Sequence, residues 1–244
     1  DASIALLNEM LLQPRWDQNE FERIKARRLT SIKQSKGNAN SIAAQAFFKQ
    51  LYGADHLAGM PTGGTLETVE NIQLDDLKAY YNANFTPKNA SFHIVGDIKR
   101  AQVEKALLQL AQWDGEQVEI PQQAKVANLT KPKLYFIDLP KAKQSVIYMG
   151  KALVPGDNNN FYPIEFANMR LGGGISARLA QTLRIEKGYT YGAYSYLLDS
   201  SYQSPFIASS QVRTNVTLES LEIFKKLVGE YKETYTEDDL AVAK

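Results

Sequence analysis

The sequence contains no cysteine, only two histidines and no long apolar run. Without cysteine, the chain has no disulfide, no thiol nucleophile and no cysteine-ligated zinc site. The two histidines, His56 and His93, lie 37 positions apart. A catalytic zinc site usually needs two histidines at helical spacing and a third ligand, so we expect no metal site in this chain. No stretch of about 18 or more apolar residues is present, so we also expect no membrane span.

The chain carries almost no net charge, because 28 lysines and arginines are balanced by 27 aspartates and glutamates. A module that binds nucleic acid needs a positive surface to attract phosphate groups, so this alternative is disfavoured. The hydrophobic fraction of 44% and the charged fraction of 23% are typical of a globular protein. The chain begins at Asp1 without a methionine and ends at Lys244 inside a predicted helix, so we expect a segment of a longer protein.

The first half of the sequence is mainly helical in pattern. Asp17 is typical of a helix N-cap, and Glu20 stands where a capping box needs it. The predicted helices cover 2–13, 18–36, 40–53, 66–72 and 75–84, and a helical face recurs through 103–111. Between the last two of these helical stretches, the apolar run 90–96 predicts a buried strand.

The second half of the sequence mixes strands and helices. The predicted strands are 133–139, 144–153, 189–198 and 204–212, and the last of these is expected at an exposed sheet edge that accepts an extended peptide. Helices are predicted around 164–171, at 175–188 and 218–231, and after Thr236. Short turns between strands and runs of helices indicate an α+β class with antiparallel sheets covered by helices. The expected domains are a helix-rich region over residues 1–112, a linker over 113–132 and an α+β subdomain over 133–244, truncated at its C-terminus.

Two motifs have structural interpretations that compete with functional ones. The glycines at 172–174 lack the pattern of a P-loop or a dinucleotide site, so they are expected to end one helix before the next. The four tyrosines at 189, 191, 194 and 196 alternate along a predicted strand, which places the first two and the last two on opposite faces. Aromatic residues in strands usually pack in the core or across strands, so a base-stacking platform is disfavoured.

Arg184 and Tyr191 are the candidate functional residues. Arg184 lies between apolar Leu183 and Ile185, in the last helical turn before Gly188. Tyr191 follows where the next strand begins, which allows its hydroxyl to approach the guanidinium. An arginine and a tyrosine that converge on one cleft are suited to bind a peptide carbonyl and a developing oxyanion.

The stretch "LGGGISARLAQTLRIEKGYTYGAYSY" (171–196) resembles the C-terminal signature of the insulinase/pitrilysin metallopeptidases, which carry an inverted H-x-x-E-H zinc motif. It is most similar to the bacterial processing-peptidase-like branch. The resemblance extends back through 51–98, so it covers most of the chain. It implies a half-module of two related subdomains, the first of them truncated here. In this family two homologous halves enclose a peptide; one half holds zinc, and the other contributes an arginine and a tyrosine, which fall on Arg184 and Tyr191.

The sequence departs from the family pattern in its zinc ligands. H-x-x-E-H is absent, and no glutamate occurs between Arg23 and Thr65, where a catalytic half carries its third zinc ligand. The resemblance therefore implies the zinc-free C-terminal half of a metalloendopeptidase, which shapes the substrate chamber and supplies Arg184 and Tyr191 to the scissile carbonyl. Zinc would be held by an N-terminal half or a partner subunit, and the substrate would be a peptide or unfolded polypeptide.

An alternative of a different class is kept open. Some members of the family lack proteolysis and serve as structural or peptide-holding subunits, and the sequence alone does not separate these from assisting halves. In both cases the segment by itself has no zinc site, so enzymatic activity belongs to the full-length protein or complex. The compartment is left undecided, with a periplasmic or membrane-associated bacterial protein as the setting considered.

Overall fold

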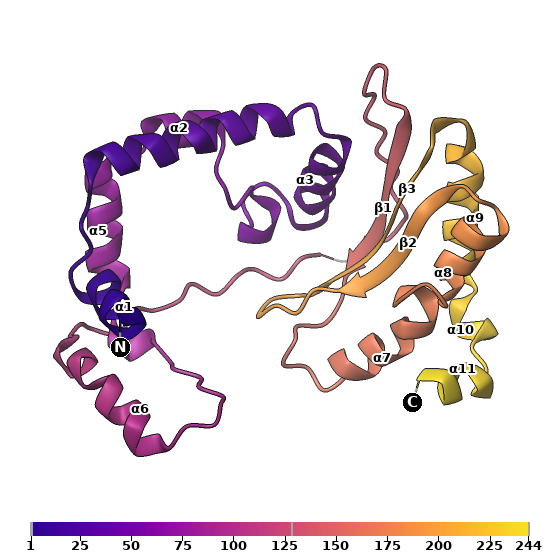
Figure 1. The fold of residues 1–244 in the computed structure, drawn as a ribbon. Coiled ribbons are helices and arrows are strands. Elements are labelled where there is room, and N and C mark those ends of the chain that lie inside the picture. Colours follow the sequence, from indigo (N-terminus) through magenta and orange to yellow (C-terminus); the bar gives the residue numbers. More distant parts are fainter. Residues whose placement is uncertain (1, 128, 244) are drawn as a thin grey trace. The chain divides into compact units, whose positions relative to one another are not determined.

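The computed structural model describes residues 2–127 and 129–243, which form helices and one three-stranded antiparallel sheet (Figure 1). The described chain packs into two compact units, the first formed by 2–33 with 63–122 and the second by 34–62 with 123–243. The α+β class predicted from the sequence is confirmed. The domain boundaries proposed from the sequence stay a prediction.

The first unit contains helices and no strand among its described residues. Its helices are α1 (Ala2–Leu12), most of α2 (Gln18–Ser35), α4 (Leu66–Asn71), α5 (Leu74–Asn84) and α6 (Arg100–Ala106), with short 3₁₀ turns at Pro87–Asn89 and Leu108–Gln112. Asp17 caps α2 as predicted, because its carboxylate accepts from the Glu20 N–H at 2.9 Å. The Glu20 carboxylate pairs with Arg23 instead of returning to Asp17, so only half of the expected capping box forms.

The second unit is built on a three-stranded antiparallel sheet in the order β1-β3-β2. Its strands are β1 (Gln144–Ala152), β2 (Thr190–Leu197) and β3 (Pro205–Arg213), so three of the predicted strands are confirmed. The prediction that 204–212 forms an exposed edge is wrong. β3 pairs with β1 on one side and with β2 on the other, so its main-chain groups are already used and no peptide can add to it.

One face of this sheet is covered by helices (Figure 1). α7 (Phe161–Gly172), the short α8 (Arg178–Ala180) and α9 (Thr217–Gly229) pack there, and the connecting turn Gln181–Glu186 is π-helical. Apolar residues of the sheet and of these helices form the core: Ile147, Leu171, Leu179, Leu183, Ala193, Ala208, Val212, Val216 and Phe224. α3 (Ala39–Tyr52) lies against β1.

α7 approaches β2 closely, and a buried polar pair fixes the approach. The Asn168 amide donates to the Ser195 carbonyl at 2.8 Å and accepts from the Ser195 hydroxyl at 2.5 Å. A Cβ atom at Gly172 would lie 2.1 Å from the Ser195 nitrogen, so only glycine fits there. The glycines at 172–174 end α7, as predicted, and the next helix begins at Arg178, later than the predicted 175.

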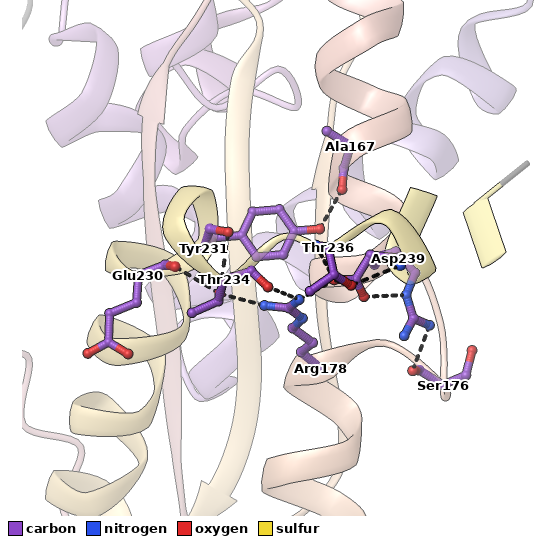
Figure 2. A network of polar contacts seen from close by, with 9 residues as sticks. Ala167, Ser176, Arg178, Glu230, Tyr231, Thr234, Thr236 and Asp239 are labelled. Carbon is purple, nitrogen blue, oxygen red and sulfur yellow. Dashed lines mark hydrogen bonds and ion pairs between the residues drawn. The ribbon is translucent and has the colours of Figure 1, made fainter. Parts of the chain in front are cut away.

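A network of ionic and hydrogen bonds holds the last helices, α10 (Tyr231–Thr234) and α11 (Glu237–Ala243), against α7 and α8 (Figure 2). Buried Asp239 accepts from Arg170 Nε at 3.1 Å and pairs with Arg178. Asp239 and Thr236 also bond reciprocally to each other's backbone N–H, which caps α11 where the sequence predicted a helix start. Tyr231 donates to the Ala167 carbonyl at 2.6 Å.

Two predicted strands are wrong. The segments 90–96 and 133–139 form no strand, and most of their large apolar side chains are exposed, Val95 and Phe136 among them. A strand is stabilised by hydrogen bonds to a neighbouring strand, and neither segment pairs with one among the described residues. The two strands were predicted from apolar composition alone, which carries no information about whether a neighbouring strand is available for pairing.

The stretch predicted as a linker, 113–132, has no helix or strand among its described residues; residue 128 lies outside them. The end of this stretch is attached to the second unit by Gln203. The Gln203 amide oxygen accepts from the Val126 N–H, and its amide nitrogen donates to the Val126 carbonyl at 3.3 Å. None of the helices in the described ranges is both long and apolar enough to cross a bilayer.

Candidate functional site

Tyr191 lies at an irregularity in β2. Thr190 pairs with Val212 and Ala193 with Ser210, so Tyr191 and Gly192 together oppose the single residue Gln211. This arrangement is a β-bulge, which bends a strand and changes the direction of its side chains. The Thr190 hydroxyl lies 2.6 Å from the Gln211 carbonyl and accepts from the Gly192 N–H at 3.1 Å, and these contacts fix the bulge.

The bulge corrects the prediction that Tyr191 and Tyr194 lie on opposite faces. Simple alternation separates residues an odd number of positions apart, but the extra residue of the bulge reverses the alternation beyond it. Tyr191 and Tyr194 therefore line the same hollow, and Tyr191 remains 89% exposed. A Cβ atom at Gly192 would lie 2.6 Å from the Tyr194 ring, so a glycine at the bulge leaves room for that ring.

The hollow lies on the sheet face that α7, α8 and α9 do not cover, and it has a volume of about 340 Å³. Tyr148 of β1, Ser209 of β3 and Tyr194 of β2 stand in one row across the sheet. The small serine between two tyrosines leaves a depression in the middle of the row. The lining residues are Asn40, Gln144, Val146, Tyr148, Thr190, Tyr191, Gly192, Tyr194, Ser209, Ser210 and Gln211.

The lining of the hollow, as far as the described residues form it, contains no carboxylate, lysine, arginine or histidine. It offers hydroxyl and carboxamide groups beside aromatic rings instead. Tyr196 follows Tyr194 by two residues on β2. Burial raises the pKa of its hydroxyl, and Tyr148 raises this pKa further, whereas a hydrogen bond with Ser209 lowers it. Tyr196 therefore stays protonated near neutral pH.

Arg184 lies on the π-helical turn that precedes β2. The Lys187 N–H donates to the Thr182 carbonyl at 3.1 Å, which is the wide hydrogen bond of a π-helix, and Gly188 ends the turn with a φ of 62°. Single π-helical turns inside helices often occur at functional sites. The Arg184 side chain is exposed, lines no part of the hollow and makes no hydrogen bond to Tyr191, which is also among the described residues.

The two histidines occupy different units and different environments. His56 is buried, stacks on Tyr52 at 4.9 Å and accepts from the Ala58 N–H through Nδ1, whereas His93 is exposed. In the described ranges no three or more histidine, aspartate or glutamate side chains come together in a way that could hold a metal ion. The described residues of this chain therefore supply no set of zinc ligands. The resemblance assigns the zinc to another half of the protein.

The three carboxamide residues of the hollow are among the lining residues that the sequence did not predict. Asn40, Gln144 and Gln211 come from α3, β1 and β3, and amides scattered over 172 positions form no motif. Their meeting depends on the packing of α3 on β1 and on the pairing of β1 with β3.

The family model described as "Peptidase M16 inactive domain" matches residues 71–244. The chain therefore belongs to the M16 peptidase family, in the group of its inactive domains. The resemblance to the insulinase/pitrilysin metallopeptidases is confirmed.

Curated relatives carry two kinds of name. A Bacillus subtilis protein called "Uncharacterized zinc protease YmxG" is 27% identical over 82% of this chain and 47% of its own length. A Helicobacter pylori protein called "Non-peptidase homolog YmxG" is 26% identical over 100% of this chain and 56% of its own length. The chain thus spans about half the length of the curated relatives it matches.

Solved structures share the fold. A peptidase M16 inactive domain from Pseudomonas fluorescens matches with a TM-score of 0.90 at 24% identity, covering 99% of this chain and 58% of that one. A protease from Helicobacter pylori matches with a TM-score of 0.87 at 18% identity, covering 99% and 59%. At these identities the similarity establishes the fold alone.

Proposed function

We propose that this chain is a non-catalytic half of an M16 protein that holds an extended, unfolded polypeptide on the sheet face opposite α7, α8 and α9. The observation that carries the proposal is the hollow beside β2, where Tyr191 stands 89% exposed above a floor of hydroxyl and carboxamide groups. Exposed aromatic side chains beside a hollow are typical of contact sites, because they bury a large area at small entropic cost. The family description and the name of the Helicobacter relative support a role without proteolysis.

Within this proposal, Arg184 and Tyr191 bind the main chain of the polypeptide. A guanidinium has five N–H donors and a tyrosine has one O–H donor, and both are suited to peptide carbonyl oxygens. Arg184 is exposed on a turn that leads directly into β2, so its long side chain is free to reach a bound peptide.

A second candidate function is assistance to a zinc-bearing half, with the same two residues directed at the scissile carbonyl. The name of the Bacillus relative favours it. The two candidates differ in whether the bound peptide is cut when the rest of the protein is present.

The test is the fluorescence anisotropy of a labelled unfolded peptide titrated with the chain in the presence of a metal chelator. We expect binding that Tyr191→Phe weakens about 2- to 10-fold and Arg184→Ala about 10- to 100-fold, as expected for one neutral and one charged hydrogen bond. Tyr162→Phe and Arg27→Ala are matched controls, because both residues are exposed and lie outside the hollow. Absence of binding to a varied set of peptides would contradict the proposal, and chelator-sensitive cleavage by the full-length protein would favour the second candidate.

A further inference from the structure

Three residues with carboxamide side chains line the hollow, and their amide groups form no hydrogen bonds with one another. Asn40, Gln144 and Gln211 line it from three different elements. None of their side-chain amides makes a hydrogen bond within residues 2–127 and 129–243. Each amide offers two donor hydrogens and an oxygen with two lone pairs, which is the same set that a peptide group presents.

The other polar groups of the lining are largely engaged. The Thr190 hydroxyl donates to the Gln211 carbonyl and the Ser210 hydroxyl donates to the Gly192 carbonyl, and Ser209 interacts with the Tyr196 hydroxyl. The unused hydrogen-bonding capacity is therefore concentrated in the three amides and in the tyrosine hydroxyls of the rim.

The row across the sheet defines the width of the hollow. Neighbouring strands lie about 4.8 Å apart, so Tyr148 and Tyr194 are separated by about 10 Å across Ser209. This spacing leaves room for one side chain above the serine, between two tyrosines. Arg213 at the end of β3 pairs with Gln144 of β1. Its positive charge lies near the hollow, but Arg213 is not one of the lining residues.

We infer that the hollow binds an uncharged segment of polypeptide, with the amides of Asn40, Gln144 and Gln211 bonding its peptide groups and a neutral side chain seated above Ser209. This inference rests on the proposed function and specifies its substrate class. A lysine or glutamate at the seated position would lose water without gaining an opposite charge, which disfavours charged segments. Gln211 is the residue that sets this preference, because it opposes the bulge at the centre of the hollow.

The test uses three labelled peptides that differ only at one central residue, which is glutamine, lysine or glutamate. We expect the 244-residue chain to bind the glutamine peptide about tenfold more tightly than either charged peptide, as measured by anisotropy. The Gln211→Glu variant should bind the lysine peptide more tightly than the glutamine peptide. Added salt should weaken this preference of the variant for lysine, but not the preference of the wild type for glutamine. Gln50→Glu adds the same charge on the exposed side of α3, outside the hollow, and should leave the order unchanged.

Circular dichroism of each variant checks that the fold is kept. Equal affinity for the three peptides, or a lysine preference produced equally by Gln50→Glu, would overturn the inference while leaving peptide holding intact. Failure of all three peptides to bind would overturn the proposed function and the inference together, so the two failures are distinguishable.

Discussion

Single residues decide how closely the elements of the second unit approach one another. Gly172 lets α7 lie against β2, where Asn168 and Ser195 exchange two hydrogen bonds out of contact with water. Gly192 makes room for the Tyr194 ring at the bulge. Neither glycine has a left-handed backbone conformation, and at Gly172 it is the nearby backbone of β2 that requires glycine.

Gly172→Ala should lower the free energy of unfolding by about 1–3 kcal/mol, because the added methyl group meets the backbone of β2 and forces the helix away. Urea denaturation followed by circular dichroism measures this change. Gly174→Ala is the matched control, since no atom beyond the adjacent residues lies within 4 Å of the added methyl group, and it should change stability by less than about 0.5 kcal/mol. Equal effects of the two substitutions would show that the close approach of α7 to β2 is not the cause.

At the scale of the elements, side-chain electrostatics hold α11 in place. Asp239 is buried, and burial raises the pKa of its carboxyl, but hydrogen bonds from Thr236, Arg170 and Arg178 outweigh this and lower the pKa to about 2. Arg178 also donates to the Thr234 hydroxyl at 2.6 Å and to its carbonyl at 2.7 Å. The carboxylate and two arginines thus join the C-terminal helices to the sheet-covering helices (Figure 2).

Asp239→Asn should lower the free energy of unfolding by about 2–3 kcal/mol at neutral pH, because two arginines lose their counter-charge. The folded pKa of about 2 is below the ordinary value of 3.8, so the contribution of the carboxylate is complete above about pH 4 and is lost as the pH falls towards 2. The stability difference between wild type and variant should shrink over that window.

Thermal unfolding between about pH 2 and pH 7 measures this difference. Asp238→Asn, in the exposed first turn of the same helix, is the control for removing a charge. A difference between Asp239→Asn and wild type that stayed constant down to about pH 2 would contradict the assignment of the pKa.

At the scale of the whole molecule, two apolar segments stand exposed, one in each unit. In the first unit these are residues of 92–98, and in the second the run 134–137, where Phe136 is 85% exposed. Exposed apolar runs of this kind bind other apolar surfaces and favour aggregation. The chain alone should therefore tend to associate, whatever its full-length setting.

Phe136→Lys should reduce both the binding of an apolar fluorescent dye and the self-association of the chain, because a charge interrupts the exposed run. Dye fluorescence and light scattering at several protein concentrations measure the two effects. Thr130→Lys adds the same charge at an exposed position outside the run and should change neither. If both lysine variants behaved alike, net charge and not the exposed apolar run would control association.

The sequence by itself determined the α+β class, the helices around Asp17 and Thr236, three strands of the sheet and the family. These features depend on local periodicity, caps and a contiguous motif, all of which are written along the chain. Only the tertiary structure decided that β3 is central, that 90–96 and 133–139 have no strand partner among the described residues, and that a bulge joins Tyr191 with Tyr194 at one hollow. Strand order, pairing and the meeting of Asn40, Gln144 and Gln211 depend on contacts between residues far apart in sequence, for which a single sequence contains no local signal.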